Sequence, residues 1–309
     1  MRYHVFMNIF LNSGYIWAGG IHVAKKIGDL HKKWKSLRLQ DHSIDMLSEI
    51  EELLQCYSSE SSTKLVITNK SKLKWMKESF GSGDDALSKI GVSNNFFSID
   101  EDVEDKKFDV NQYISSSLEL LFRNVTWMKD ISDIIVRAVV PIKIINHSDK
   151  YHKAGFSSLE VKGLIFYSFN NKNINRIEMA VDYAHELGHQ ALFVYQAADL
   201  IIRNGEKHKI YSSIKKADRP AIMTFHSLAA LSYMKVAVEE LASDKSLCCE
   251  EIEYSLMLNK SISRMLLETI QNIEKSEVQF TGLGQMLFEE FSSTYYYKKG
   301  KCRKQIIWI

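Results

Sequence analysis

The segment from His185 to His189 reads His-Glu-Leu-Gly-His, and its residue types and spacing suit a metal site. It lies within a stretch of helical periodicity from Ile177 to Tyr195. Residues four apart share a face of a helix, so His185 and His189 can bind one ion. Glu186 points in a neighbouring direction and can act beside the metal. The sequence therefore predicts a metal centre on this helix.

A third protein ligand is needed, because two histidines alone do not make a metal site with open positions for water or substrate. One candidate is Glu240, which forms an E-x-x-x-D pattern with Asp244. That pattern resembles the gluzincin metallopeptidases. The resemblance implies Glu240 as the third zinc ligand, Asp244 as a residue that orients a histidine, and Glu186 as the general base that activates zinc-bound water.

The other candidate is His226, which has an apolar neighbourhood. Alone, such a histidine is more often a core residue, but the HExxH segment favours it as a ligand. If residues 221–243 form one helix, Glu240 and His226 lie on similar faces but about 21 Å apart along the axis. They cannot bind the same ion unless that helix breaks, so the two candidates lead to different enzymes.

The run from His185 to Met234 resembles the α-ketoglutarate-dependent HExxH-type peptide β-hydroxylases, which modify ribosomally made peptides. The resemblance covers about residues 150–240. Besides the HExxH segment, the residues that carry it are Tyr211, Ser213, Asp218-Arg219-Pro220, His226, Ala229, Ala230 and Met234. The segment from Ala154 to Ile165 also resembles the strand that precedes the motif in that family. The spacing of Asp218 and Arg219 is tighter here than in the family pattern.

The resemblance implies an Fe(II) ion held by His185, His189 and His226, with α-ketoglutarate and O2 at the open positions. Non-haem iron oxygenases usually use two histidines and one carboxylate. An all-histidine face departs from that pattern, and it leaves Glu186 outside the ligand set. The implied reaction is hydroxylation of a side-chain β-carbon in a precursor peptide.

The cosubstrate also needs a cation for its distal carboxylate, and the arginine fork pairs with carboxylates through two hydrogen bonds. Arg219 precedes His226 by about two helical turns and is the predicted partner, with Arg203 in reserve. Tyr211 and Ser213 are weaker candidates for the same pocket. The oxygenase interpretation rests on this multi-residue run, whereas the zinc peptidase interpretation rests on Glu240 and Asp244.

The elements that must position these residues are expected to be mainly helical, because the 309 residues include only two prolines and 14 glycines. The expected fold is mainly α (α+β): a helical bundle with a small β element before the HExxH helix. The hydrophobic spacing predicts helices over about 1–55, 113–136, 177–202, 220–243, 250–274 and 281–293, strands at 64–68, 139–145 and 163–169, and loops at 57–63 and 203–218. Asp218 is the expected N-cap of the helix that starts at Pro220.

A change of pattern near residue 137 suggests two regions. Residues 1–136 would form a helical N-terminal region that recognises a peptide or partner, and residues 137–309 the HExxH catalytic domain. The net charge of +2 gives no basic face for nucleic acid, and no stretch is apolar enough to predict a membrane span. Four cysteines without a C-x-x-C spacing argue against a disulfide scaffold, which favours a cytoplasmic location.

Overall fold

The computed structural model describes residues 70–71, 73–74, 97–100, 102–103, 109–136, 138–144, 155–158, 163–169, 175–198 and 200–296. Over these residues the chain is mainly helical with a small mixed sheet and a hairpin, which confirms the predicted α+β class. The expected helix over 1–55, the loop at 57–63, the strand at 64–68 and most of the proposed N-terminal region lie outside the described residues.

The helices are α6 (Val110–Asn124), α7 (Thr126–Ile135), α8 (Arg176–Ala198), α9 (Ala221–Leu241), α10 (Cys249–Glu274) and α11 (Gly282–Ser293). The strands are β1 (Phe97–Ile99), β2 (Ala138–Ile144), β3 (Gly155–Ser157), β4 (Leu164–Ser168), β5 (Lys209–Ser212) and β6 (Ala217–Pro220). The predicted strands at 139–145 and 163–169 are confirmed as β2 and β4. The short strands β1 and β3 were not predicted, because three residues are too few to show an alternating pattern.

The four-stranded sheet has the order β1-β2-β4-β3, with β2 and β4 parallel at its centre and antiparallel strands at both edges. Every residue of β4 is buried, as expected for a central strand covered on both faces. Pro141 lies in β2, where a proline is unusual. Its carbonyl accepts from Asp100 N on the β1 side, so its missing N–H also faces β1 and leaves the pairing with β4 intact.

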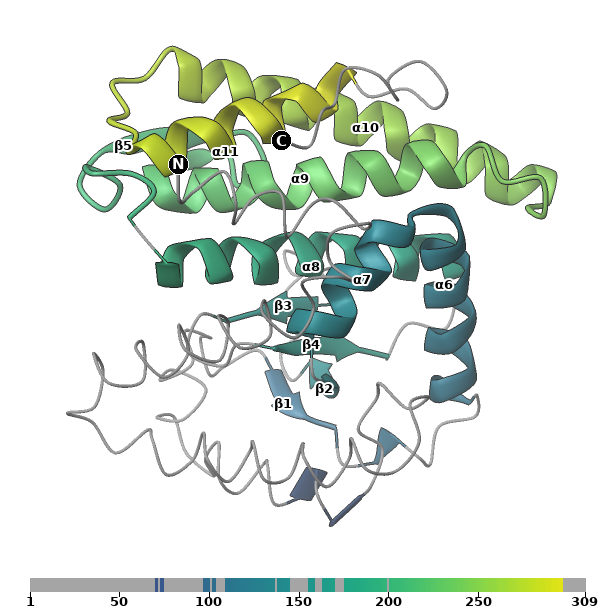
Figure 1. Ribbon diagram of the computed structural model, residues 1–309. Helices are drawn as coiled ribbons and strands as arrows, with labels where there is room; N and C mark the ends of the chain where they lie inside the picture. Colours follow the sequence, from purple (N-terminus) through teal and green to yellow (C-terminus); the bar gives the residue numbers. More distant parts are fainter. Residues whose placement is uncertain are drawn as a thin grey trace, which may run out of the picture.

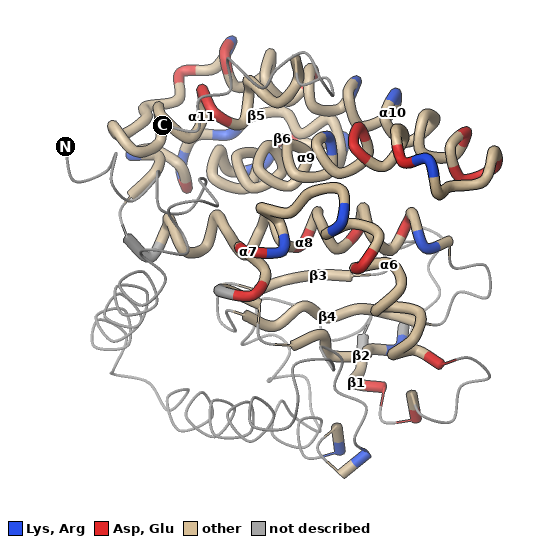
Figure 2. Tube along the Cα trace, turned by 45° about the vertical axis from the view of Figure 1, so that its right-hand side comes forward, with Lys and Arg blue, Asp and Glu red and all other residues tan. Residues whose placement is uncertain are grey.

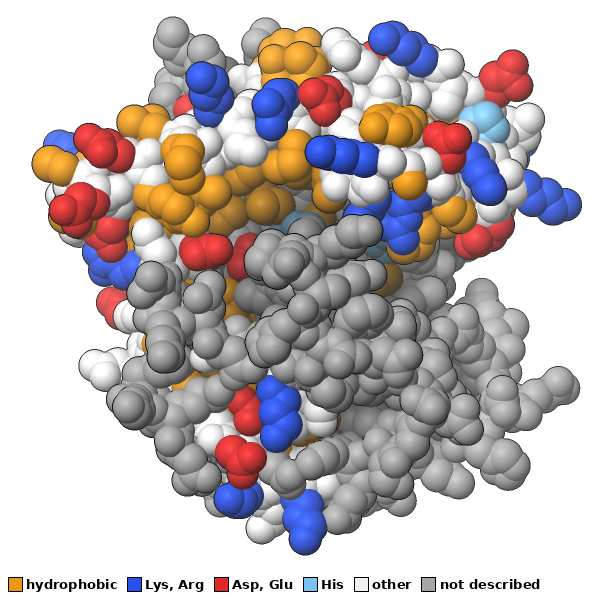
Figure 3. Space-filling model, turned by 180° about the vertical axis from the view of Figure 1, so that it is seen from behind, with side chains coloured by type: hydrophobic (Ala, Val, Ile, Leu, Met, Phe, Trp, Pro, Cys, Tyr) orange, Lys and Arg blue, Asp and Glu red, His pale blue; other side chains and the backbone are white. Residues whose placement is uncertain are grey.

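Figure 1 shows the layers: α8 lies between the sheet and α9, and α10 and α11 cover the far side of α9. Each of α8 and α9 is therefore covered by other elements on two opposite faces. In Figure 2 charged residues gather on the outer helices such as α10 and α11, whereas β3 and β4 carry none. Figure 3 shows a band of apolar side chains across the upper helical layer, seen from the back.

Among the described residues, α9 is the one helix long and apolar enough to cross a membrane, but 78% of its most apolar window is buried inside the molecule. Such burial is typical of a core helix. The backbones of α8 and α9 approach very closely at Gly188. A Cβ atom added to Gly188 would lie 3.0 Å from both the Ala229 carbonyl oxygen and the Ala230 Cα.

Three details of the helix boundaries differ from the sequence prediction. The expected helix at 113–136 is two helices, because Val125 leaves helical geometry at φ −130° and ψ 75°. The expected loop at 203–218 contains the β5–β6 hairpin. Asp218 therefore lies in a strand and is not an N-cap, and Pro220 occupies the N-cap of α9 and not its first turn.

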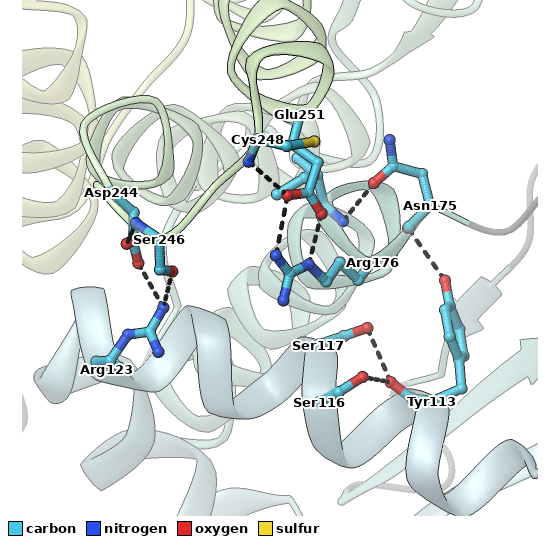
Figure 4. Close-up of polar contacts among 11 residues, drawn as sticks. Tyr113, Ser116, Ser117, Arg123, Asn175, Arg176, Asp244, Ser246, Cys248 and Glu251 are labelled. Atoms are coloured by element: carbon cyan, nitrogen blue, oxygen red, sulfur yellow. Dashed lines mark hydrogen bonds and ion pairs between the residues drawn. The ribbon is translucent and has the colours of Figure 1, made fainter.

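Polar contacts join helices that are distant in sequence (Figure 4). Arg176 at the start of α8 forms two hydrogen bonds with the Glu251 carboxylate, and this pairing lowers the pKa of Glu251 to about 2. In the last turn of α6, Arg123 pairs with Asp244, which follows α9. These contacts hold the outer helices α6 and α10 at the ends of α8 and α9.

A buried carboxyl group lies between α9 and α11. The Oε2 atom of Glu290 is buried and has no hydrogen-bond partner in the described part of the chain, although the residue as a whole keeps some exposure. Burial raises the pKa of Glu290 to about 8. It lines a small cavity with Trp127 and Tyr233. The neutral acid is therefore the form that suits the folded protein at neutral pH.

We expect Gly188→Ala to destabilise the protein by about 1 to 3 kcal/mol, because the added methyl meets backbone atoms on α9 that cannot turn away. In an open helix the same change would stabilise by up to about 1 kcal/mol. Gly282→Ala is the matched control, since no atom lies within 4 Å of its added Cβ. Urea unfolding of both variants measures the difference, and equal behaviour would contradict the close packing.

The Glu290 carboxyl predicts a pH dependence of stability. Its pKa is higher in the folded state than the usual value of 4.5, so folding binds a proton between these pKa values, and stability falls as pH rises from about 4.5 to 8. Glu290→Gln should remove this fall. At pH 9 we expect the variant to be more stable than the wild type by on the order of 1 to 3 kcal/mol, with little difference below pH 5. Parallel stability curves for the two proteins would contradict this account.

Candidate metal centre

The first two predicted ligands lie together on α8. His185 Nε2 and His189 Nε2 are 3.1 Å apart, and the two rings meet edge to face. Two nitrogens that each bind one ion at about 2.0–2.1 Å lie about 2.9–3.4 Å apart for bond angles of 90–110°. The spacing of this pair therefore fits a shared ion, as the i, i+4 position predicts.

His226 joins the pair from α9. Its Nδ1 lies 3.4 Å from Nδ1 of His189, and its ring also packs against Phe193. Its other ring nitrogen, Nε2, lies 2.9 Å from the Gln196 amide oxygen. Burial lowers the pKa of His226 to about 4, so the ring is neutral at physiological pH. A neutral imidazole is the form that binds metals.

The three rings do not point at one common centre. His189 faces His185 through Nε2 and His226 through Nδ1. Within the described ranges, no group of three His, Cys, Asp or Glu side chains has the arrangement that holds a metal ion. A single ion bound by all three histidines would require the His189 ring to turn. The donor types, the spacing and the burial fit a metal, and the ring orientation as it stands does not.

Glu186 lies beside this cluster in the interior. Only 4% of its side chain is exposed, and its Oε1 atom is 3.9 Å from His185 Nε2. This distance is too long for a hydrogen bond, but it places a carboxylate next to the nitrogen that faces His189. The role of Glu186 beside a metal ion stays a prediction.

Glu240 does not reach the histidines. It follows His226 by 14 positions on α9, which is one unbroken helix from Ala221 to Leu241. Because α8 and α9 run in opposite directions, Met234 lies opposite His185 and Glu240 lies about 9 Å farther along the axis, away from His226. The unbroken helix therefore keeps Glu240 and His226 apart, and His226 is the one of the two that contacts His189.

Asp244 is also engaged elsewhere (Figure 4). It accepts a hydrogen bond from Arg123 at 2.7 Å, beyond the C-terminal end of α9. It accepts another from Asn124 at 2.6 Å. Burial alone would raise the pKa of Asp244, but the hydrogen bonds it accepts lower the pKa well below its usual value. Through these contacts Asp244 fastens the end of α9 to α6.

The predicted cosubstrate residues lie on the β5–β6 hairpin and beside it. Arg219 pairs with buried Ile210, so the two side chains share the inward face, and Arg219 is half-buried. Tyr211 is 49% exposed, on the opposite face. The Ser213 hydroxyl accepts from Asn272 on α10. The reserve residue Arg203 is exposed. Of these residues, Arg219 alone combines partial burial with a position two residues before α9.

Two contacts of the cluster were not predicted from the sequence. Gln196 lies seven residues after His189, which returns it to the same face of α8 after two turns, so the helical period could have indicated it. Met234 lies with its sulfur 3.2 Å from His185 Nδ1. No sequence signal marks Met234 as a contact of His185, because the pairing depends on the register between two helices.

No protein-family model matches this chain, and no curated protein is significantly similar to it. The resemblance to the peptide β-hydroxylases therefore rests on the residues quoted for it.

The competing ligand assignments predict different effects of two substitutions. We expect His226→Ala to weaken Zn²⁺ or Co²⁺ binding by more than about 100-fold, because even outer residues of metal sites contribute 10- to 100-fold. Glu240→Gln should leave metal affinity near the wild-type value. Calorimetric titration of both variants measures this, with circular dichroism to confirm folding. Loss of binding in Glu240→Gln alone would favour the peptidase assignment.

Proposed function

We propose that this protein is a metal-dependent enzyme whose ion is bound by His185, His189 and His226, and that it acts as an Fe(II)/α-ketoglutarate-dependent peptide hydroxylase. The observation that carries the proposal is the position of His226. It comes from a different helix, 37 residues after His189, and its Nδ1 lies 3.4 Å from that ring. Three imidazoles from two helices meet here, with His226 buried and His185 and His189 partly exposed, and apolar residues would fill the buried part of this position better if it served packing alone.

The choice of iron over zinc is supported by the composition of the site. Glu240, the third ligand that a gluzincin peptidase would use, is displaced along α9, and Asp244 is bound to α6. If the His189 ring turned so that the three histidines met one ion, their nitrogens would leave positions open for a cosubstrate and O2, as non-haem oxygenases require. When bound, the ion would supply the activation of O2.

The protein's own residues would bind and orient the reactants. Glu186 would accept a hydrogen bond beside the ion, outside the ligand set. Arg219 would pair with the distal carboxylate of α-ketoglutarate, and Tyr211 and Ser213 are the weaker partners that the resemblance implies. Helix α9 joins this arrangement directly, because the hairpin that carries Arg219 continues into the helix that carries His226.

The substrate class follows from the resemblance: a ribosomally made precursor peptide that is hydroxylated on a side-chain β-carbon. Residues 1–136 are the proposed region for recognition of that peptide. Strand β1 from this region pairs with β2, so a peptide held there would be bound next to the sheet that supports α8. The proposed location is the cytoplasm, and nucleic acid and membranes are not proposed partners.

Anaerobic reconstitution tests this function. We expect the protein to bind Fe²⁺ and, on addition of α-ketoglutarate, to show a metal-to-ligand charge-transfer band in the visible spectrum. Arg219→Ala should weaken α-ketoglutarate binding by about 10- to 100-fold, the effect of losing a charged hydrogen-bonded pair, with Fe²⁺ affinity nearly unchanged. Exposed Arg264 on α10 supplies the matched control, Arg264→Ala, which should behave as the wild type.

Two results would contradict the proposal. Tight Zn²⁺ binding without any band from Fe²⁺ and α-ketoglutarate would favour the peptidase. Absence of binding for every divalent ion would reduce the histidine cluster to a packing role. Equal loss of α-ketoglutarate binding in both arginine variants would remove Arg219 from the site but leave the metal assignment standing.

A further inference from the structure

We propose that a groove along α8 binds the peptide substrate, and that an arginine side chain of this peptide enters a pocket at the start of the helix, beside Glu178 and Asp182. The inference rests on the proposed function for the identity of the substrate as a peptide. It adds to that function a specific recognition element, an arginine about three residues from the position that is modified.

The groove follows from the pattern of burial on α8. Over residues 177–193, four residues keep partial exposure, and all of them are polar: Glu178, Asp182, His185 and His189. Their successive spacing of four, three and four positions places them on one side of the helix. Within the described part of the chain, α8 is therefore reachable along one polar line, which ends at the histidine cluster.

An open pocket of about 790 Å³ lies where this line begins. It is lined by residues from the starts of three helices, among them Tyr113 on α6, Arg176 on α8 and Tyr254 on α10. Figure 4 shows Tyr113 and Arg176 on neighbouring helices around this region. A volume of this size is within the usual range of ligand pockets and accommodates a large side chain with part of its backbone.

Two carboxyl groups of α8 lie next to the tyrosines of the pocket. Tyr254 donates a hydrogen bond to Glu178, and the Tyr167 hydroxyl donates one to Asp182 at 3.1 Å. Burial, followed by the negative charges of these two carboxylates, raises the pKa of Tyr113 and of Tyr254. The phenol groups are therefore neutral, and the charge at this end of the groove is that of the carboxylates.

The charge balance of the pocket favours a cationic occupant. Arg176 is the basic residue among the described residues that line it, and its guanidinium is already paired with the Glu251 carboxylate. Glu250 also lines the pocket, so Glu250, Glu178 and Asp182 leave an excess of negative charge. A cation that enters would exchange its hydration for these carboxylates.

An organic cation fits this pocket better than a metal ion. Within the described ranges, no group of three His, Cys, Asp or Glu side chains is arranged to hold a metal. The tyrosine rings instead provide faces that attract an organic cation. Arginine suits both features, because its planar fork pairs with carboxylates and its plane stacks on aromatic rings.

The position of the carboxyl groups on α8 sets the distance to the histidines. Asp182 and Glu178 precede His185 by three and seven positions, which is about 5 and 11 Å along the helix axis. An extended peptide spans about 3.3 Å per residue. A peptide whose arginine occupies the pocket would therefore present a residue about three positions away to the histidine cluster.

Titration of the full-length protein without added metal tests the pocket separately from any metal chemistry. The probe is acetyl-Gly-Gly-Arg-Gly-Gly-amide, compared with the same peptide carrying citrulline, which keeps the shape and loses the charge. We expect the arginine peptide to bind at least about 10-fold more tightly, the effect of a charged hydrogen bond. The double substitution Glu178→Gln and Asp182→Asn should abolish this preference, with circular dichroism to confirm folding.

The matched control is the double substitution Glu268→Gln and Glu274→Gln. It removes the same charge from exposed positions of α10, about 21 Å or more along the axis from Tyr254, and should keep the preference. Equal binding of the two peptides, or an unchanged preference after loss of Glu178 and Asp182, would overturn the proposal. Displacement of the arginine peptide by Ca²⁺ would also overturn it, since the pocket would then be a metal site.

Crosslinking tests the direction of the groove. A benzophenone is placed three residues before the arginine in one peptide and three residues after it in another. One of the two should crosslink to α8 or α9 near the histidines, and crosslinks of both confined to α6 and α10 would contradict the groove. If the protein binds neither Fe²⁺ nor α-ketoglutarate, the proposed function fails, whereas the arginine preference still decides whether the pocket binds a peptide.

Discussion

The close contact between α8 and α9 at Gly188 is the constraint on which the candidate site depends. A residue without a side chain lets the backbone of one helix lie against Ala229 and Ala230 of the other. At this separation a ring on α9 can reach a ring on α8, and His226 does so. A wider spacing would leave the HExxH pair facing an apolar surface. The contact between the histidine rings therefore depends directly on how closely the two helices pack.

The surrounding elements maintain that contact from both sides. The sheet supports α8 through its buried central strands, and α10 and α11 press on α9 from the opposite side (Figure 1). Charged pairs fasten the ends, with Arg176 on Glu251 at one helix start and Arg123 on Asp244 beyond the end of α9. Since most residues of α8 and α9 are buried, movement of one helix against the other would disturb many buried side chains at once.

Much of this architecture could be predicted from the sequence, and the elements that could not be predicted have physical reasons. The i, i+4 spacing of His185 and His189 and the apolar periods of α8, α9, α10 and α11 depend on local geometry, so they could be predicted. The break at Val125 and the β5–β6 hairpin could not, because their local patterns fit other structures equally well. Gln196 and Met234 depend on the register between helices, which one sequence does not encode in any single segment. The separation of His226 from Glu240 needed only one further fact, that α9 is continuous.

The contact at Gly188 also limits how this sequence can change. The atoms that a larger residue would meet are the carbonyl oxygen of Ala229 and the Cα of Ala230, which belong to the main chain. A larger residue at 188 would therefore have to displace the backbone of one helix from that of the other. The second variable position of the HExxH motif is therefore not free in this fold.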